Sequence, residues 1–166
     1  MGVKTHTGKD DFPDMRKTVK TLNNTKIQCG VLGEQAWLAA IHEYGCKIKV
    51  TPKMRAYLHR QGLHLKKTTE YVVIPERSFL RNGYDENIAS ILNKTDKLVP
   101  AVLNGKIPEH KFFKLIGELL RSAIQDYARD LKDPANHPFT VKQKGSENPL
   151  IDSGDMVGAI DYEVVK

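Results

Sequence analysis

The chain has 166 residues, which is enough for one domain with a single core and room for an arm. Its 40% hydrophobic and 28% charged residues are ordinary for a globular protein, and its net charge is +6. No apolar run is long enough for a membrane span and the start lacks the apolar segment of a signal peptide, so we expect a cytosolic protein. Cys29 and Cys46 form no Cys-x-x-Cys pair, which favours two reduced thiols over a disulfide or a metal site.

The chain begins with a segment that we interpret as an arm, followed by a strand and a helix. Residues 1–24 are polar and charged, and we expect a flexible N-terminal arm or a short strand that orders only in an assembly. Residues 25–32 alternate as a half-buried strand does. A helix over residues 33–44 then ends at Gly45, which suits a left-handed cap. The residues on the apolar side of this helix are Ala36, Trp37, Ala40, Ile41 and Tyr44.

Residues 45–74 are a basic insertion, named the flap below, which we expect to fold as strand, helix and strand. Residues 46–51 alternate apolar and basic side chains, and Thr51 with Pro52 is a favourable start for a short helix to about residue 60. A β-branched run over residues 70–74 then forms the second strand, up to Pro75. No acidic residue occurs between positions 43 and 70. The cations there are Lys47, Lys49, Lys53, Arg55, Arg60, Lys66 and Lys67.

The remaining elements are mostly helical. We expect Asp85 to cap a helical region that breaks between residues 95 and 100, and Pro108 to start the clearest helix. Residues 139–143 and 159–165 are strand-like. Together these elements predict an α+β fold, in which a small, mainly antiparallel sheet packs on one long helix and the flap is inserted. Residues 25–166 are expected to form one domain.

None of the groups that suggest catalysis is complete. His42 and Glu43 open a zinc-protease motif, in which the second histidine would be at position 46. Cys46 occupies that position and could ligate zinc, but Gly45 ends the helix between them. We therefore expect His42 to bond nearby carbonyls. Residues 152–155 lack both a calcium-ligand series and a nucleophile elbow, so we interpret them as a turn that caps residues 156–158. No phosphate-binding loop occurs, and we predict no catalytic residue, cofactor or metal.

Two features leave their interpretation open. The flap cations either attract an anionic partner, nucleic acid or an acidic protein surface, or form a solvated loop without a specific partner. Little aromatic interleaving and no helix-turn-helix spacing argue against sequence-specific reading of bases. Phe79 and Leu80, between Arg77 and Arg81, are either a core anchor with solvated neighbours or an interface plug. The candidates for interface or DNA contacts are Lys47, Lys49, Lys53, Arg55, Arg60, Lys66, Lys67, Arg77, Phe79 and Arg81.

Three ordered segments resemble one protein family. Residues 39–45 (AAIHEYG) and 74–81 (IPERSFLR) are similar to the signature of neck or tail-completion proteins of tailed bacteriophages, which virion-morphogenesis proteins share. The third segment, which resembles the closing part of the family, comprises residues 134–146 (PANHPFTVKQKGS) and 149–164 (PLIDSGDMVGAIDYEV). The helix around residues 114–120 is similar to the family's central helix. The chain departs at residues 133–135, Ser153, Met156 and Ala159, where the family has a Pro-Pro pair, Thr, Leu and Ser.

The resemblance implies a non-enzymatic virion assembly protein that completes the tail or joins tail to head as a ring of identical subunits, six in number. Implied partners are further copies, the head–tail connector, tail tube or terminator proteins, and packaged DNA contacted non-specifically. The protein would be in the host cytoplasm during assembly and in the neck or tail of the mature virion, whether phage or prophage, without membrane contact. The alternatives are a minor tail or tail-terminator protein, a non-specific nucleic-acid-binding module and, most remotely, a metal-dependent hydrolase.

Overall fold

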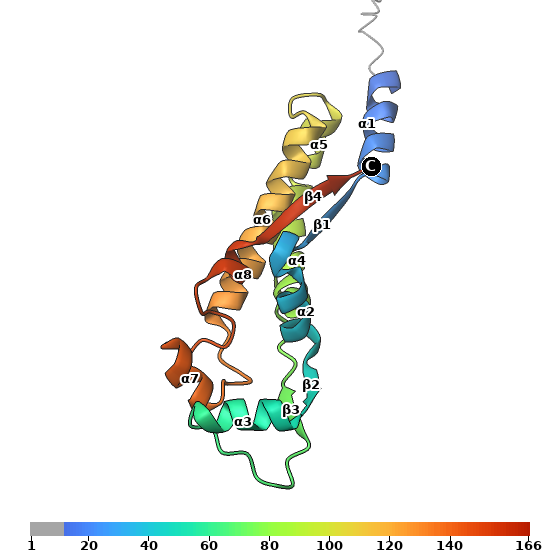
Figure 1. Ribbon diagram of the computed structural model, residues 1–166. Coiled ribbons are helices and arrows are strands. Elements are labelled where there is room, and N and C mark those ends of the chain that lie inside the picture. The colour runs from blue at the N-terminus through green and yellow to red at the C-terminus, as the bar shows by residue number, and fades with distance from the viewer. Residues whose placement is uncertain (1–11) are drawn as a thin grey trace, which may run out of the picture.

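Helix α6 (Glu109–Asp130) is the longest element and organises the core of the computed structural model, which describes residues 12–166 (Figure 1). It starts after Pro108, and its buried residues recur at steps of one to four along the helix. They are Phe112, Phe113, Gly117, Leu120, Ile124 and Ala128. One side of α6 packs against α4 (Phe79–Asp96), and another side packs against a two-stranded sheet.

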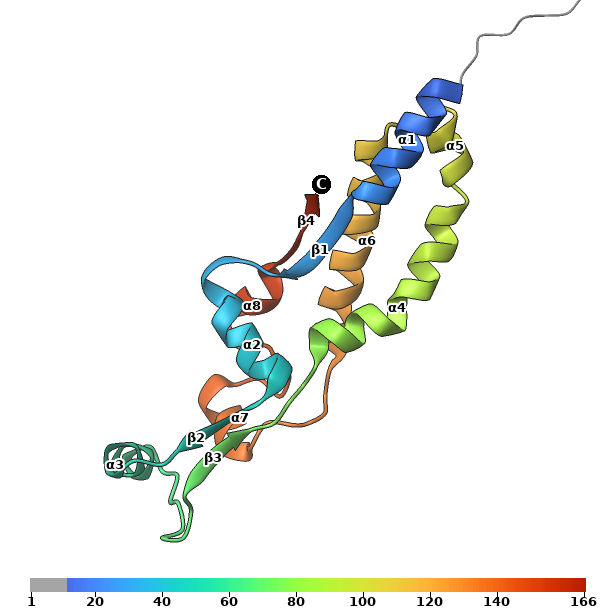
Figure 2. The same ribbon diagram turned by 90° about the vertical axis from the view of Figure 1, so that its right-hand side faces the viewer.

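The sheet on α6 joins the two ends of the domain. Strands β1 (Lys26–Val31) and β4 (Ile160–Val165) pair antiparallel, from Lys26 opposite Val165 to Val31 opposite Ile160 (Figure 2). The α+β fold with a small antiparallel sheet on one long helix is therefore confirmed. Two glycines let these elements approach: a Cβ at Gly83 of α4 would lie 3.2 Å from the Cα atom of Ile124, and a Cβ at Gly117 would overlap the Tyr162 ring.

The flap projects from one end of the molecule, beyond α2 (Ala36–Tyr44) (Figures 1 and 2). It consists of β2 (Cys46–Lys49), α3 (Pro52–Arg60) and β3 (Tyr71–Ile74), with β2 and β3 antiparallel, so the predicted β-α-β insertion is confirmed. Thr51 Oγ1 accepts a hydrogen bond from the Met54 amide at 3.1 Å and caps α3. Gly45 ends α2 with φ 71°, although its ψ of 169° lies outside the left-handed helical region.

Short elements complete the chain. They are α1 (Phe12–Asn24), the 3-10 turn η1 (Gly33–Gln35), α5 (Val99–Leu103), α7 (Pro138–Lys144) and α8 (Asp155–Gly158). The break expected between residues 95 and 100 is confirmed, because α4 ends at Asp96 and α5 starts at Val99. No helix between residues 12 and 166 is both long and apolar enough to cross a bilayer.

The structure corrects the expected N-terminal arm over part of its length. Residues 12–24 form helix α1, which contacts α5 and α6, while residues 1–11 lie outside the described part of the chain. Met15, Thr18 and Leu22 lie on its half-buried side, at helical spacing. Thr18 Oγ1 also donates to Glu109 Oε1 at 3.0 Å, which ties α1 to the start of α6.

Two further predicted boundaries were wrong. Helix α4 begins at Phe79, not at Asp85, because a carboxylate from another helix caps it, as described below. Residues 138–144 form helix α7 instead of a strand. Pro138 is at the start of α7, the His137 side chain accepts from the Phe139 amide, and Gly145 at φ 68° ends the helix. These local caps override the β-propensity of Phe139 and Val141.

Candidate functional site

Segments distant in sequence meet in one buried polar network around Arg77. The Arg77 side chain is almost fully buried and donates from Nε to the Pro134 carbonyl at 3.0 Å. Its Nη1 lies 3.1 Å from His42 Nδ1, and its Nη2 donates to Asn136 Oδ1 at 3.1 Å. The Arg77 amide also donates to the His42 carbonyl at 2.8 Å. The segments 39–45, 74–81 and 134–136 are therefore joined through one guanidinium group.

Glu43 caps helix α4 from the end of helix α2. Its carboxylate, 2% exposed, accepts from the Leu80 amide at 2.9 Å and from the Arg81 amide at 3.2 Å. These amides lie in the first turn of α4, where the helix dipole favours a negative charge. Ser78, the residue before the helix, is held at φ 30° and supplies no side-chain cap. Glu43 therefore performs the capping that Ser78 does not.

Arg81 extends this cluster to the surface. Its Nε donates to Glu43 Oε1 at 2.7 Å, and its Nη2 donates to Glu76 Oε1 at 2.7 Å. The guanidinium also lies 5.0 Å from the centre of the Tyr44 ring, within cation–π range. The hydrogen bonds to Glu43 and then Glu76 raise the pKa of Arg81. Hydrogen bonds from Ser78 and Arg81 lower the pKa of Glu76.

His42 is held neutral by its surroundings. Burial, followed by the positive charges of Arg77 and Lys144, lowers its pKa from 6.5 to about 4. Its Nδ1 can then accept from Arg77, so the expectation that His42 bonds nearby carbonyls through its ring was wrong. Cys46 lies on β2, beyond the end of the helix. Within residues 12–166, no group of three or more His, Cys, Asp or Glu residues is placed to hold a metal ion.

Lys144 and Asn148 organise the closing segment. Lys144 Nζ donates to the carbonyls of Asn148 at 2.6 Å and Ile151 at 2.9 Å. Asn148 donates to the Arg129 carbonyl at 2.6 Å and accepts from the Leu150 amide at 2.8 Å, which ties the segment to the end of α6. The sequence alone does not reveal the roles of Lys144, Asn148 and Asn136, because a single Lys or Asn does not show which carbonyls it will meet in the fold.

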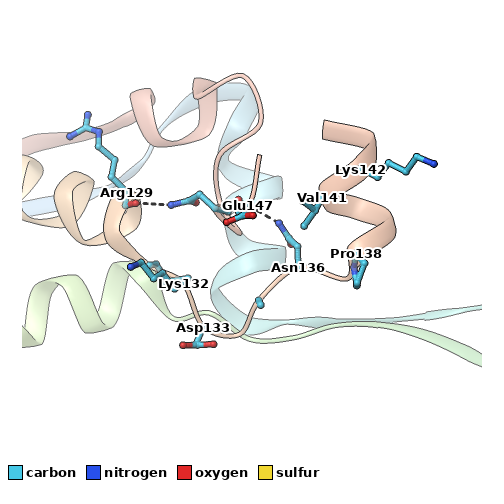
Figure 3. A pocket seen from close by; sticks show the side chains of 11 residues that line it. Arg129, Lys132, Asp133, Asn136, Pro138, Val141, Lys142 and Glu147 are labelled. Atoms are coloured by element: carbon cyan, nitrogen blue, oxygen red, sulfur yellow. Dashed lines mark hydrogen bonds between the residues drawn. The ribbon is translucent and has the colours of Figure 1, made fainter. Parts of the chain in front are cut away.

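A cavity of about 750 Å³ lies between the end of α6 and α7 (Figure 3). Its charged lining residues are of both signs: Arg129, Lys132, Lys142, Asp133 and Glu147. None of its described lining residues is a Ser, Cys or His, the side chains that most often act as nucleophile or base. The predicted turn at residues 152–155 is present, and Ser153 Oγ donates to Asp155 Oδ2 at 2.7 Å and accepts from the Asp155 amide. The expected side-chain cap on residues 156–158 was wrong, because α8 begins at Asp155 after Gly154 and no side chain caps it.

Most flap cations are exposed, but one has a structural role. Arg55 is half-buried and donates to the carbonyls of Leu65, Lys66 and Thr69 at 3.1, 2.8 and 2.7 Å, so it holds the loop that follows α3. Its place among the candidate contact residues is therefore corrected. The exposed cations of the flap are Lys47, Lys49, Lys53, Arg60, Lys66 and Lys67.

Two candidates near the start of α4 are also corrected. Phe79 is 0% exposed and lies in the core with Ile124 and Ile160, so it is an anchor and not an interface plug. Arg77, expected to be solvated, is buried by the network that satisfies its donors. Only Arg81 of this group reaches the surface.

The apolar side of α2 faces outward. Trp37 is 66% exposed and Tyr44 is 68% exposed, whereas Ala39 and Glu43 face the interior. Tyr71 and Val73 of β3 are also exposed, at 48% and 58%. Large apolar side chains therefore lie uncovered on α2 and on the flap.

Comparisons with protein-family models, with curated proteins and with solved structures each found no match for this chain.

Proposed function

We propose that this chain is a non-enzymatic virion assembly protein of a tailed bacteriophage. In this proposal it completes the tail or joins the tail to the head as a ring of identical subunits, six by the resemblance. Its neighbours are then the head–tail connector and tail tube or terminator proteins. The observation that carries the proposal is the uncovered apolar surface on α2 and the flap, formed by Trp37, Tyr44, Tyr71 and Val73.

The role of the resembling motifs supports this proposal. In segments 39–45 and 74–81, His42, Glu43, Arg77 and Arg81 satisfy one another and the first turn of α4. Their arrangement fixes the base from which the flap projects. Gly45 belongs to this base, because a Cβ there would lie 2.8 Å from the Glu76 amide nitrogen. A rigid base under a projecting flap is suited to presenting contacts to neighbouring proteins.

Quantitative mass spectrometry of purified virions or tail-like particles from the source strain tests the proposal. We expect a small fixed copy number, near six per particle. Absence of the chain from the particles, while it is present in the lysate, would overturn a structural role in the neck or tail.

A second function, non-specific nucleic-acid binding, is favoured by one observation: the cluster of exposed flap cations that includes Lys53, Lys66 and Lys67. Electrophoretic mobility shift with a random duplex at increasing salt tests it. Binding that weakens steeply with salt and is lost when the flap lysines are replaced by Ser would favour this function. No shift at low salt would contradict it.

A further inference from the structure

One face of the flap hairpin combines positive charge with apolar surface. Lys47 lies opposite Val73, and Lys49 lies opposite Tyr71, in the register of β2 and β3. Directly opposed residues of an antiparallel pair project from the same face, and the two pairs are two residues apart. All four side chains are exposed, so no other element among residues 12–166 covers this hairpin face.

A cleft with complementary properties lies between α4 and α6. Its volume is about 540 Å³, and it is lined by four exposed carboxylates: Glu86, Asp126, Asp130 and Asp133. Lys132 is the one cation among its described lining residues, and Asp126 also pairs with Arg129 at 2.9 Å. Ala123, Tyr127 and Leu131 supply apolar surface between the carboxylates.

The two surfaces belong to different parts of the molecule. The hairpin projects beyond the start of α4 and the end of α6 (Figures 1 and 2). The cleft is lined by residues of those two helices and by residues 131–133. A contact between the hairpin of one copy and the cleft of another is heterologous, because the two copies contribute different surfaces to it. Heterologous contacts generate a closed ring when the rotation between neighbours closes.

We propose that the hairpin face of one copy docks in the acidic cleft between α4 and α6 of a second copy. The occupant is a second copy because its cleft offers carboxylates for Lys47 and Lys49 and apolar side chains for Tyr71 and Val73. A phosphate backbone would satisfy the lysines alone. This inference rests on the proposed ring of identical subunits, and it names the surfaces that join them.

Carbodiimide cross-linking of the full chain provides a direct test, because this reagent couples a lysine amine to a carboxylate in contact with it. Equal amounts of ¹⁴N- and ¹⁵N-labelled protein are mixed at low salt, so that mass spectrometry separates links between copies from links within one copy. We expect mixed-isotope links from Lys47 or Lys49 to one of the four cleft carboxylates, those of Glu86, Asp126, Asp130 and Asp133. Links between copies only at other sites, or none, would overturn the proposal.

A charge swap provides the second test. One variant carries Lys47→Glu and Lys49→Glu, and the other carries Glu86→Lys and Asp130→Lys, which spares the Asp126–Arg129 ion pair. In sedimentation velocity, each variant alone should self-associate at least about tenfold more weakly than wild type. Their equimolar mixture should recover association, because each flap then meets a cleft of opposite charge. The control Arg60→Glu with Lys67→Glu has the same charge change outside the hairpin face and should associate as wild type does.

Three results would contradict the docking. In the first, each variant by itself self-associates as strongly as wild type. In the second, the equimolar mixture associates no more strongly than either variant by itself. In the third, the Lys47→Glu, Lys49→Glu variant loses duplex binding but keeps its self-association. The last result would assign the lysines to nucleic acid. The particle count remains independent: the chain found in particles without these cross-links would leave the proposed function standing and end this inference. If these cross-links form but the chain is absent from particles, the docking of the two surfaces stands and the proposed function falls.

Discussion

At the scale of single residues, the most consequential group is the buried carboxylate of Glu43. It accepts two amide hydrogen bonds of α4 and one from Arg81, and it is 2% exposed. Glu43→Gln removes the negative charge. It also places the side-chain NH2 group of the glutamine against an N–H group of Leu80 or Arg81, so that two donors face each other. We expect a loss of about 2–3 kcal/mol in the free energy of unfolding, measured by urea denaturation. Glu76→Gln changes the exposed partner of Arg81 and should have a much smaller effect. Equal effects of the two substitutions would contradict the capping role.

His42 gives the molecule a defined response to acid. Its folded-state pKa of about 4 lies below the ordinary value of 6.5, so the unfolded chain binds more protons between these two pH values. The contribution of neutral His42 to stability is complete above pH 6.5 and is lost as the pH falls toward 4. In His42→Asn, the amide oxygen can still accept from Arg77 but does not titrate.

We therefore expect the unfolding free energy of His42→Asn to fall less between pH 6.5 and 4 than that of wild type, measured by urea denaturation at each pH. His110→Asn replaces an exposed histidine of α6 and serves as the control for the His-to-Asn substitution itself. Identical slopes for wild type and His42→Asn would show that the imidazole is protonated as readily in the folded state as in the unfolded state.

At the scale of elements, the contact between α6 and β4 depends on the absence of a side chain at Gly117. A methyl group there would overlap the Tyr162 ring. Alanine favours a helix over glycine by about 1 kcal/mol, so a helix without this contact would gain from Gly117→Ala. We expect instead a loss of about 1–3 kcal/mol in the unfolding free energy, because the ring must move.

Two variants separate this contact from a general effect of alanine. Gly158→Ala, in α8, places a methyl group where nothing lies within 4 Å, and it should be neutral or stabilising. In the background of Tyr162→Ala, Gly117→Ala should cost nothing, which a double-mutant cycle measures. If Gly117→Ala still lowers the unfolding free energy in the Tyr162→Ala background, the methyl group is strained against another group and not against the Tyr162 ring.

Elements whose start and stop residues lie next to them in the sequence were predictable from the sequence. The flap and α6 follow from Thr51, Pro52, Pro75 and Pro108, whose effects act within one turn. The cap of helix α4 was placed seven residues late, at Asp85 instead of Ser78, because the group that caps it, Glu43, comes from a helix 36 residues before Phe79. The same long-range dependence hid the roles of Arg77, Asn136 and Asn148. Their residue types were visible, but their partners depend on segments that only the fold brings together.

The orientation of α2 shows what sequence periodicity cannot decide. Trp37, Ala40 and Tyr44 lie on one side of the helix, as predicted, and an apolar side usually faces a core. In this chain Ala39 and Glu43 face the interior instead. A stripe of apolar residues indicates a surface that needs covering, but not whether the same chain or another one covers it. This distinction matters at the scale of the whole molecule.

At that scale, Trp37 reports directly on the proposed assembly. It is the single tryptophan of the chain and is 66% exposed, so its fluorescence measures whether the outer side of α2 is covered. In the dilute protein we expect emission typical of a water-exposed indole and efficient quenching by iodide. As copies associate, the emission should shift to shorter wavelength and the quenching should weaken, because burial excludes both water and iodide.

The variant Trp37→Ala separates assembly from folding. Because Trp37 is largely exposed, the substitution should leave the unfolding free energy within about 0.5 kcal/mol of wild type. It should nevertheless reduce incorporation of the chain into particles, because large aromatic side chains dominate interface energetics. Tyr84→Ala removes a 44% exposed aromatic side chain from α4, and it serves as the control that incorporates normally. Normal incorporation of Trp37→Ala, together with iodide quenching that does not change on association, would show that the apolar side of α2 stays exposed in the assembly and is not one of its contact surfaces.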